Sequence, residues 1–359
     1  MEKSKKKRDI KKTVTNSDEE VILPPAEITS KNVEQSCAEL FRLYNENQLQ
    51  IDPDFQRNFV WKPVVQTRFI DSLVKQLPIP SIWIALDTKT EKRVVIDGLQ
   101  RVSTIFRFLK GDKWKLNKLP DIDTNISGKL LSSIKNSTPK LYKRVENYMI
   151  PVTTISCDFS KQNHMDYLFD IFHRLNTGAQ KLTNQEVRNG IYGGNFNNLL
   201  KTIVRSDEWT NIIGKTSKID RLDNEELVLR VFSFIDKLDE YNGNLAKFLN
   251  HYMSEKQNIL DNEIEEKGKM LLSSLTYIYE NIDDTASVSG LGKTVKEALL
   301  VGVCKNIDSL TLKSKEEFQS LFDDFINDEE FSEENLTQGL SKKDKVQSRL
   351  NKSISIFEE

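Results

Sequence analysis

The hydrophobic periodicity of this sequence changes once along the chain, and that change restricts the fold it can adopt. Between residues 21 and 157, short β-like runs alternate with helical segments, whereas from about residue 160 apolar residues recur only at helical spacing. The change predicts an α+β fold with a domain boundary close to residue 159. We therefore expect an α/β domain over residues 23–159 and a helical domain over residues 160–359.

Composition and charge point to a protein of the cytoplasm. Residues 1–22 are predicted to form a disordered basic tail, because they are rich in lysine and carry few apolar side chains. Over all 359 residues the formal net charge is −2, so no overall field attracts DNA or a membrane, and any nucleic-acid surface must be a local patch. No apolar run reaches the roughly 18 residues of a membrane span, and no signal-peptide pattern occurs. We therefore expect a cytoplasmic location and no membrane contact.

Cysteine and histidine usage limits which disulfides and metal sites the sequence can form. The three cysteines, Cys37, Cys157 and Cys304, lie far apart and form no CxxC motif, which favours a reducing compartment. The three histidines belong to no HxxxH or HExxH pattern, so a zinc site is not expected. A magnesium ion held by carboxylates stays compatible with the sequence.

The segment 51–61 places Gln56 and Arg57 among aromatic residues, just before a proline that suits the first turn of a helix. An amphipathic stripe predicts that this helix spans residues 63–77 and stops at Pro78. Arg57 can clamp a phosphate or stack on a base, or it can pair with a neighbouring aspartate and pin the loop. The residues alone leave both roles open.

A buried strand is predicted to give way to a helix at Asp97 and Gly98. Residues 81–86 and 93–96 are typical of two strands of a hairpin, and apolar residues at helical spacing follow from Val102. The first N–H groups of a helix have no intrahelical partners and carry the positive end of its dipole, so an anion is favoured there. Glycine lets a bound group approach the backbone closely. The sequence therefore predicts a phosphate-binding turn.

Side chains next to this turn can complete such a site. Arg101 can reach the same anion, and Gln100 offers an amide to a base, a sugar or a phosphate. Asp97 can coordinate magnesium or orient a water molecule. The alternative is an ordinary strand-to-helix turn in which Asp97 caps the helix and pairs with Arg101.

A second polar break is predicted between helices. An apolar stripe over residues 165–172 predicts a helix that stops at residues 174–178, where Arg174 and Asn176 stand. From the residues alone, a well-capped turn between two helices is the favoured interpretation of this break.

Two residue pairs have the spacing of capping boxes. Thr183 is followed three residues later by Glu186, and Asp223 is followed by Glu226 at the same distance. Each pair predicts the start of a helix.

Three passages share their order and spacing with a known family. They are Phe55-Gln56-Arg57 with Phe59-Val60-Trp61; Pro78-Ile79-Pro80 with Ile96-Asp97-Gly98-Leu99-Gln100-Arg101; and Phe172-His173-Arg174-Leu175-Asn176-Thr177-Gly178 with Leu182-Thr183 and Glu186-Val187-Arg188-Asn189. Together they resemble the N-terminal domain of GmrSD-type modification-dependent restriction enzymes, the DGQQR-motif family of the ParB/sulfiredoxin-like superfamily. The resemblance spans nearly everything beyond residue 22 and implies a ParB-like α/β domain followed by a helical domain.

The resemblance implies binding or hydrolysis of a nucleoside triphosphate, with Mg²⁺, and a role in bacterial defence against foreign DNA. The implied catalytic residues are Asp97, Gln100 and Arg101, with Asp97 as the magnesium ligand. The implied nucleotide-binding residues are Gln56, Arg57, Asp97, Gly98, Gln100, Arg101, Arg174 and Asn176.

Two departures from the family pattern bear on activity. The first glutamine of the family motif is Leu99 here, which removes one hydrogen-bonding group and is expected to affect turnover more than binding. The HNH-type nuclease domain that many relatives carry is not expected, because the sequence has neither the length nor the histidines for it.

Sulfiredoxin chemistry is not expected either, because the turn contains no cysteine.

The leading hypothesis is a nucleotide-dependent defence protein whose ParB-like site controls contact with DNA or with a separate nuclease subunit. Phosphoryl transfer needs positioning and charge neutralisation more than a covalent nucleophile, so the side chains of Asp97, Gln100 and Arg101 suffice. Two alternatives stay open: a non-enzymatic DNA-binding or scaffold module, and a Mg²⁺-dependent nuclease with Asp97 as a ligand. A homo-oligomer is compatible with the sequence.

Overall fold

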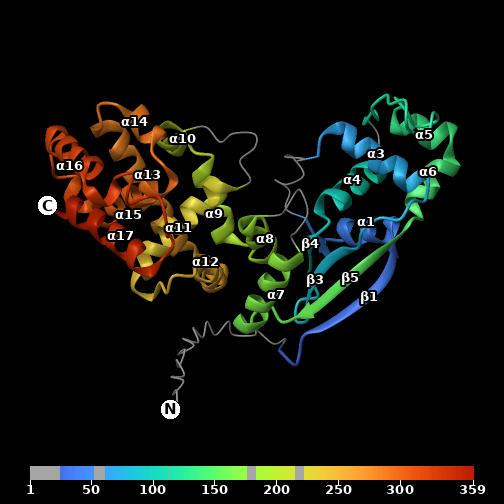
Figure 1. Cartoon of the computed structure of the whole chain (residues 1–359), viewed down its shortest axis with the longest axis horizontal. Helices are drawn as coiled ribbons and strands as arrows, with labels where there is room; N and C mark the ends of the chain where they lie inside the picture. Colours follow the sequence, from blue (N-terminus) through green and yellow to red (C-terminus); the bar gives the residue numbers. More distant parts are fainter. Residues whose placement is uncertain (1–24, 52–60, 112, 176–182, 215–221) are drawn as a thin grey trace, which may run out of the picture.

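The computed structural model describes residues 25–51, 61–111, 113–175, 183–214 and 222–359. Figure 1 shows a sheet-containing part built from the first half of the chain and a helical part built from the second half, with α7 (Gln162–Leu175) and α8 (Asn184–Ile191) between them. The α+β fold class predicted from the change of periodicity is confirmed.

The sheet has five strands in the order β1-β5-β3-β4-β2. The strands β1 and β5 are antiparallel, β5 and β3 parallel, β3 and β4 antiparallel, and β4 and β2 parallel. Their bounds are Thr29–Ser36 (β1), Leu49–Gln50 (β2), Ile82–Asp87 (β3), Arg93–Asp97 (β4) and Met149–Cys157 (β5). The hairpin predicted around residues 87–92 is therefore confirmed as β3 and β4.

Apolar side chains alternate between the two faces of the sheet, as a strand requires when both faces are covered. Val95 packs into one apolar core, which the sheet forms with a first group of helices on one face. Its neighbours Val94 and Ile96 pack into a second apolar core on the other face. Figure 1 shows α1, α3 and α4 beside the strands on the first side. The helices of this group are α1 (Cys37–Asn45), α3 (Pro63–Val74), α4 (Leu99–Lys110), α5 (Leu131–Ser137) and α6 (Pro139–Glu146).

The second face is covered by α7 and α8, which both pack on β4. A Cβ atom at Gly190 of α8 would lie only 2.8 Å from Cγ1 of Val94, so glycine permits this close approach. The same apolar core continues from this face into the C-terminal helices without interruption. The helices α7 and α8 therefore contribute to the sheet's packing, and the predicted boundary near residue 159 stays a prediction.

The C-terminal half is helical, as predicted. Its elements are α9 (Asn195–Val204), α10 (Asp207–Ile213), α11 (Asp223–Lys237), α12 (Leu245–Glu255), α13 (Asp261–Asn281), α14 (Thr285–Gly290), α15 (Lys293–Leu310), α16 (Lys315–Asn327) and α17 (Lys343–Glu358), with short 3₁₀ helices at Leu238–Glu240, Lys256–Asn258 and Glu329–Phe331. In the part of the chain that the structure describes, none of the helices has the length and apolar composition needed to cross a bilayer.

The helix predicted over residues 63–77 is shorter than expected. It ends at Val74, and Gln76 adopts a left-handed φ of 58° that terminates it before Pro78. Two members of the predicted stripe, Val65 and Leu77, are exposed. The buried face instead includes Gln66, because polar side chains of α3 bond inward to their neighbours.

Both predicted helix starts are confirmed, but only the one at Thr183 forms a capping box. The Thr183 side chain accepts from the Glu186 N–H, and the Glu186 side chain accepts from the Thr183 N–H. At α11, by contrast, the N-cap is Leu222 in a left-handed conformation, and Asp223 is already helical. Glu226 forms ion pairs instead of a cap, so tertiary partners have overridden the local motif.

Candidate functional site

The predicted phosphate-binding turn lies at one edge of the sheet, where three segments meet. β4 ends at Asp97, and its parallel neighbour β2 pairs through Gln50 with Val94, so both strands point toward this edge. β3 runs the opposite way and pairs through Trp83 with Asp97, so the segment at Pro80 also lies here. The topology therefore brings the proline-rich segment and the Asp-Gly turn together.

Gly98 is the N-cap of α4 and has a left-handed backbone, with φ 89° and ψ 13°. This conformation favours glycine. Asp97 does not cap the helix, and no side chain in the described part of the chain accepts from the N–H groups of Leu99, Gln100 or Arg101. The first turn of α4 thus keeps its unpaired donors and the positive end of its dipole.

The guanidinium of Arg101 lies directly over this turn. Its Nη2 donates to Oδ2 of Asp97 at 2.9 Å, and its Nη1 donates to the carbonyl oxygen of Pro80. A Cβ atom at Gly98 would lie 3.0 Å from that Nη2, so the missing side chain makes room for the arginine. The Arg101 side chain is only 12% exposed. It therefore stays beside the unpaired amides and does not extend into solvent.

Burial lowers the pKa of Arg101, and the nearby Asp97 carboxylate partly offsets that effect. A guanidinium so far removed from water interacts more strongly with an anion than one at the surface, because the local dielectric constant is lower. The Arg101–Asp97 pairing belongs to the ordinary-turn alternative, whereas the unpaired first-turn amides favour a binding role.

Gln100 connects the turn to the segment that precedes α3. Its Oε1 accepts from the N–H of Trp61 at 3.1 Å, and its Nε2 has no hydrogen-bond partner among the described residues. The carbonyl of Trp61 in turn accepts from Nε2 of Gln66 at 2.8 Å, and Oε1 of Gln66 accepts from Arg107 at 2.8 Å. Gln66 and Arg107 were not predicted from the sequence as members of this site. Their only signal was a polar residue on the buried side of a helix.

Leu99, which replaces the family's first glutamine, is buried in the apolar core formed by the first group of helices. Its side chain therefore contributes packing at the start of α4. The polar groups around the turn come from its neighbours at positions 97, 100 and 101.

Three of the implied binding residues, Gln56, Arg57 and Asn176, lie outside the described residues. The chain on either side of the first two is anchored at the same edge, by Ile51 after β2 and by Trp61 at Gln100.

The structure does not bring Arg174 to the turn. It lies in the last turn of α7, is 75% exposed and pairs with Asp170 at 2.9 Å. It makes no hydrogen bond or ion pair with the Asp97–Arg101 turn among the described residues. Its implied role in nucleotide binding stays a prediction.

The carboxylate of Asp97 is suited to be one ligand of a magnesium ion that a phosphate also coordinates. Only its Oδ2 is engaged, by Arg101, while Oδ1 has no partner in the described part of the chain. Mg²⁺ is commonly held by one or two carboxylates together with substrate phosphates. Within the described ranges no three His, Cys, Asp or Glu side chains gather into a group that could hold a metal by themselves. Asp97 would therefore depend on a phosphate ligand to complete the coordination.

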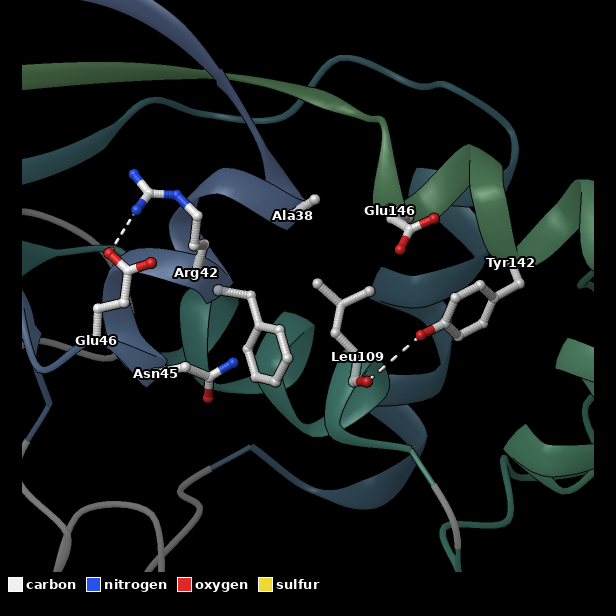
Figure 2. A pocket seen from close by; sticks show the side chains of 8 residues that line it. Ala38, Arg42, Asn45, Glu46, Leu109, Tyr142 and Glu146 are labelled. Carbon is white, nitrogen blue, oxygen red and sulfur yellow. Dashed lines mark hydrogen bonds and ion pairs between the residues drawn. The ribbon is translucent and has the colours of Figure 1, made fainter.

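A separate hollow of about 260 Å³ lies at the far end of α4, between α1 and α6 (Figure 2). The one arginine lining it, Arg42, is paired with Glu39 and Glu46. Figure 2 shows Tyr142 turned toward the carbonyl of Leu109, to which its hydroxyl donates at 3.4 Å. Because the arginine of this hollow is already paired with two carboxylates, the hollow lacks the available cation that a phosphate site needs.

Comparison with known proteins gives one match. The family model described as GmrSD restriction endonuclease, N-terminal domain, matches residues 38–193. This span includes the whole Asp97–Arg101 turn together with α7 and α8. No curated protein and no solved structure matches the chain.

Proposed function

Residues 38–193 belong to the GmrSD restriction endonuclease N-terminal domain family, and from that premise we propose that the chain is a restriction-like defence protein whose Asp97–Arg101 turn binds and hydrolyses a nucleoside triphosphate. In this proposal the state of the site controls how the protein contacts DNA or a separate nuclease subunit.

One observation carries the proposal: a buried guanidinium lies beside unpaired amides at a helix N-terminus. A phosphate in that position would accept from the first-turn N–H groups and from Arg101, which would exchange the carbonyl of Pro80 for the ligand. Neutral glycine at the cap leaves no side-chain oxygen to compete for the amides.

The neighbouring side chains supply what phosphoryl transfer needs, which is positioning and charge neutralisation. Arg101 balances charge that develops on the phosphate oxygens. Gln100, held by its Oε1 at Trp61, directs its free amide donors at a phosphate oxygen or at the attacking water. Asp97 would hold Mg²⁺, which bridges phosphate oxygens and neutralises their charge.

Calorimetric titration with the four ribonucleoside triphosphates, with and without Mg²⁺, tests the proposal. We expect wild type to bind at least one of them and Arg101→Ala to lose about 1.5 to 3 kcal/mol of binding free energy, the contribution of one charge-assisted contact. Arg42→Ala is the matched control, because Arg42 is an exposed arginine at the opposite end of α4. No binding by wild type, or equal binding by Arg101→Ala, would refute the proposal.

The two alternatives give different results with the same proteins. A DNA-binding module would bind duplex DNA without nucleotide, and its affinity would fall steeply with salt. A direct nuclease would nick plasmid with Mg²⁺ alone, and Asp97→Ala would abolish the nicking.

A further inference from the structure

Two adjoining cavities of about 350 and 360 Å³ lie within the helical part, far along the chain from the Asp97–Arg101 turn. They share Arg230 of α11, Leu245 of α12 and Ser341, which precedes α17. Their sizes are those of small-ligand sites. Figure 1 shows α11, α15 and α17 lying together in this part of the molecule.

The lining of these cavities carries more positive than negative charge. Four cationic side chains face two carboxylates, and we call this set the arginine cluster: Arg188, Arg230, Lys293 and Arg349 with Glu226 and Glu297. Asp223 approaches Lys293 at 3.5 Å but is 74% exposed, so water screens it from the buried arginines.

The two carboxylates are already shared among the cations. Glu226 lies 2.8 Å from Arg230 and 3.3 Å from both Arg188 and Lys293. Burial alone would raise the pKa of Glu226, but these three cations outweigh it and hold the pKa at about 2. Glu226 is therefore ionised at neutral pH and has no capacity left for a further cation.

Arg349 is the least satisfied member of the cluster. It is buried, its Nε has no hydrogen-bond partner among the described residues, and its nearest carboxylate oxygen, on Glu297, is 3.7 Å away. Its hydrogen bonds to the carbonyls of Lys345 and Leu340 are long, at 3.4 Å each. Burial lowers the pKa of Arg349, and Glu297 and the more distant Glu330 only partly offset this.

Neutral donors complete the lining. Thr294 and Ser341 line the same cavity as Arg349, and neither hydroxyl makes a hydrogen bond within the described residues. Ser341 is exposed, so it stands where the cavity meets solvent. An excess of cations, of which Arg188 and Arg349 are buried, together with hydroxyl donors matches the acceptor oxygens of a tetrahedral anion.

We propose that the arginine cluster binds a phosphate group, as a second anion site separate from the Asp97–Arg101 turn. The surplus of positive charge in the lining suits a phosphate anion, and the guanidinium fork of Arg349 offers the donors that such an anion accepts. Only Arg188 of the cluster lies within the span matched by the family, so the site is a feature of the helical part.

Titration with inorganic phosphate against potassium chloride of equal ionic strength tests the site, in the Arg101→Ala background that removes the other anion site. We expect binding, and a loss of affinity of at least about tenfold in Arg349→Met, the loss expected for one charge-assisted contact. Lys352→Met is the matched control, because Lys352 lies on the same helix but pairs with Asp328 at the surface. It should bind phosphate as well as its parent.

A second variant keeps the test decisive if Arg349→Met fails to fold. Lys293 is 35% exposed, so Lys293→Met should fold and still lose phosphate affinity. No binding by the parent beyond the chloride control, or unchanged binding in the foldable variants, would overturn the proposal. Titration with a nucleoside 5′-monophosphate and its unphosphorylated nucleoside then identifies the source: tighter binding of the monophosphate than of free phosphate indicates a phosphomonoester, and the reverse indicates free phosphate.

Discussion

Arg101 and Arg188 both lie within the residues that the family model matches, but their surroundings are opposite. Arg188 is 1% exposed, and its guanidinium donates to Asn250 and Gln185 and pairs with Glu226. Arg101 has one carboxylate and one carbonyl and lies beside unpaired amides. Arg188 is held in place by its partners, so it supports the fold and contributes only its positive charge to the arginine cluster. Arg101 can exchange a partner for a ligand, as the proposed phosphate site requires.

The two arginines also differ in how far along the sequence their hydrogen-bonding partners lie. Arg101 bonds to residues 4 and 21 positions away, whereas Arg188 bonds to Asn250, 62 positions away, and to Glu226, 38 positions away. A local motif therefore marks the turn at Arg101, while only the folded chain assembles the surroundings of Arg188.

Removing Arg188 should give the largest effect on stability. Arg188→Leu leaves buried amides and a carboxylate without their partner, so the free energy of unfolding should fall by about 3 to 5 kcal/mol. Urea denaturation measures it. Arg101→Ala should cost less, because Arg101 is less buried and has fewer partners. Equal losses in the two variants would remove the distinction between a fixed and an exchangeable arginine.

The loss of folding stability at low pH should report on the ionisation of Glu226. Because its pKa in the folded chain, about 2, is below the ordinary value of 4.5, its contribution is present above pH 4.5 and is lost as pH falls toward 2. That contribution is on the order of 3 kcal/mol. Unfolding followed from pH 5 to pH 2 should therefore show a shallower decline in Glu226→Gln than in wild type. An unchanged slope would mean that the cluster does not hold Glu226 ionised.

A methyl group at Gly98 should disturb the turn itself. Gly98→Ala forces a side chain into a left-handed backbone, which costs about 1 to 2 kcal/mol, and displaces the guanidinium of Arg101. We expect lower stability and weaker triphosphate binding. Gly193→Ala is the control, because a Cβ there would meet nothing within 4 Å. Nucleotide affinity that survives Gly98→Ala would argue against the turn as the phosphate site.

The smallest of these effects should come from the cap of α8, the helix that carries Arg188. Thr183→Ala removes one half of the capping box and should cost about 1 kcal/mol in thermal or urea unfolding. A loss as large as that of Arg188→Leu would show that the cap, and not the buried network, fixes this arginine.

Local patterns predicted much of the sheet edge. The hairpin, the turn at Gly98 and the cap at Thr183 each depend on residues within a few positions, so periodicity and spacing were sufficient. The resemblance then assigned a role to the turn, and the family match over residues 38–193 supports the family.

Tertiary partners account for what the sequence did not predict. The start of α11 was expected to be capped by Asp223, but Glu226 instead pairs with Arg188, Arg230 and Lys293 of three different helices. Residues as distant as Arg188 and Arg349 line adjoining cavities, and no spacing rule relates them. The inward bonds of Gln66 were missed for the same reason.

A crystal structure with a non-hydrolysable nucleoside triphosphate and Mg²⁺ tests the central claim most directly. We expect a phosphate oxygen within hydrogen-bonding distance of the N–H of Leu99 or Gln100, with the guanidinium of Arg101 turned from Pro80 onto that phosphate. A nucleotide bound elsewhere, with Arg101 still joined to Asp97 and to the carbonyl of Pro80, would contradict it.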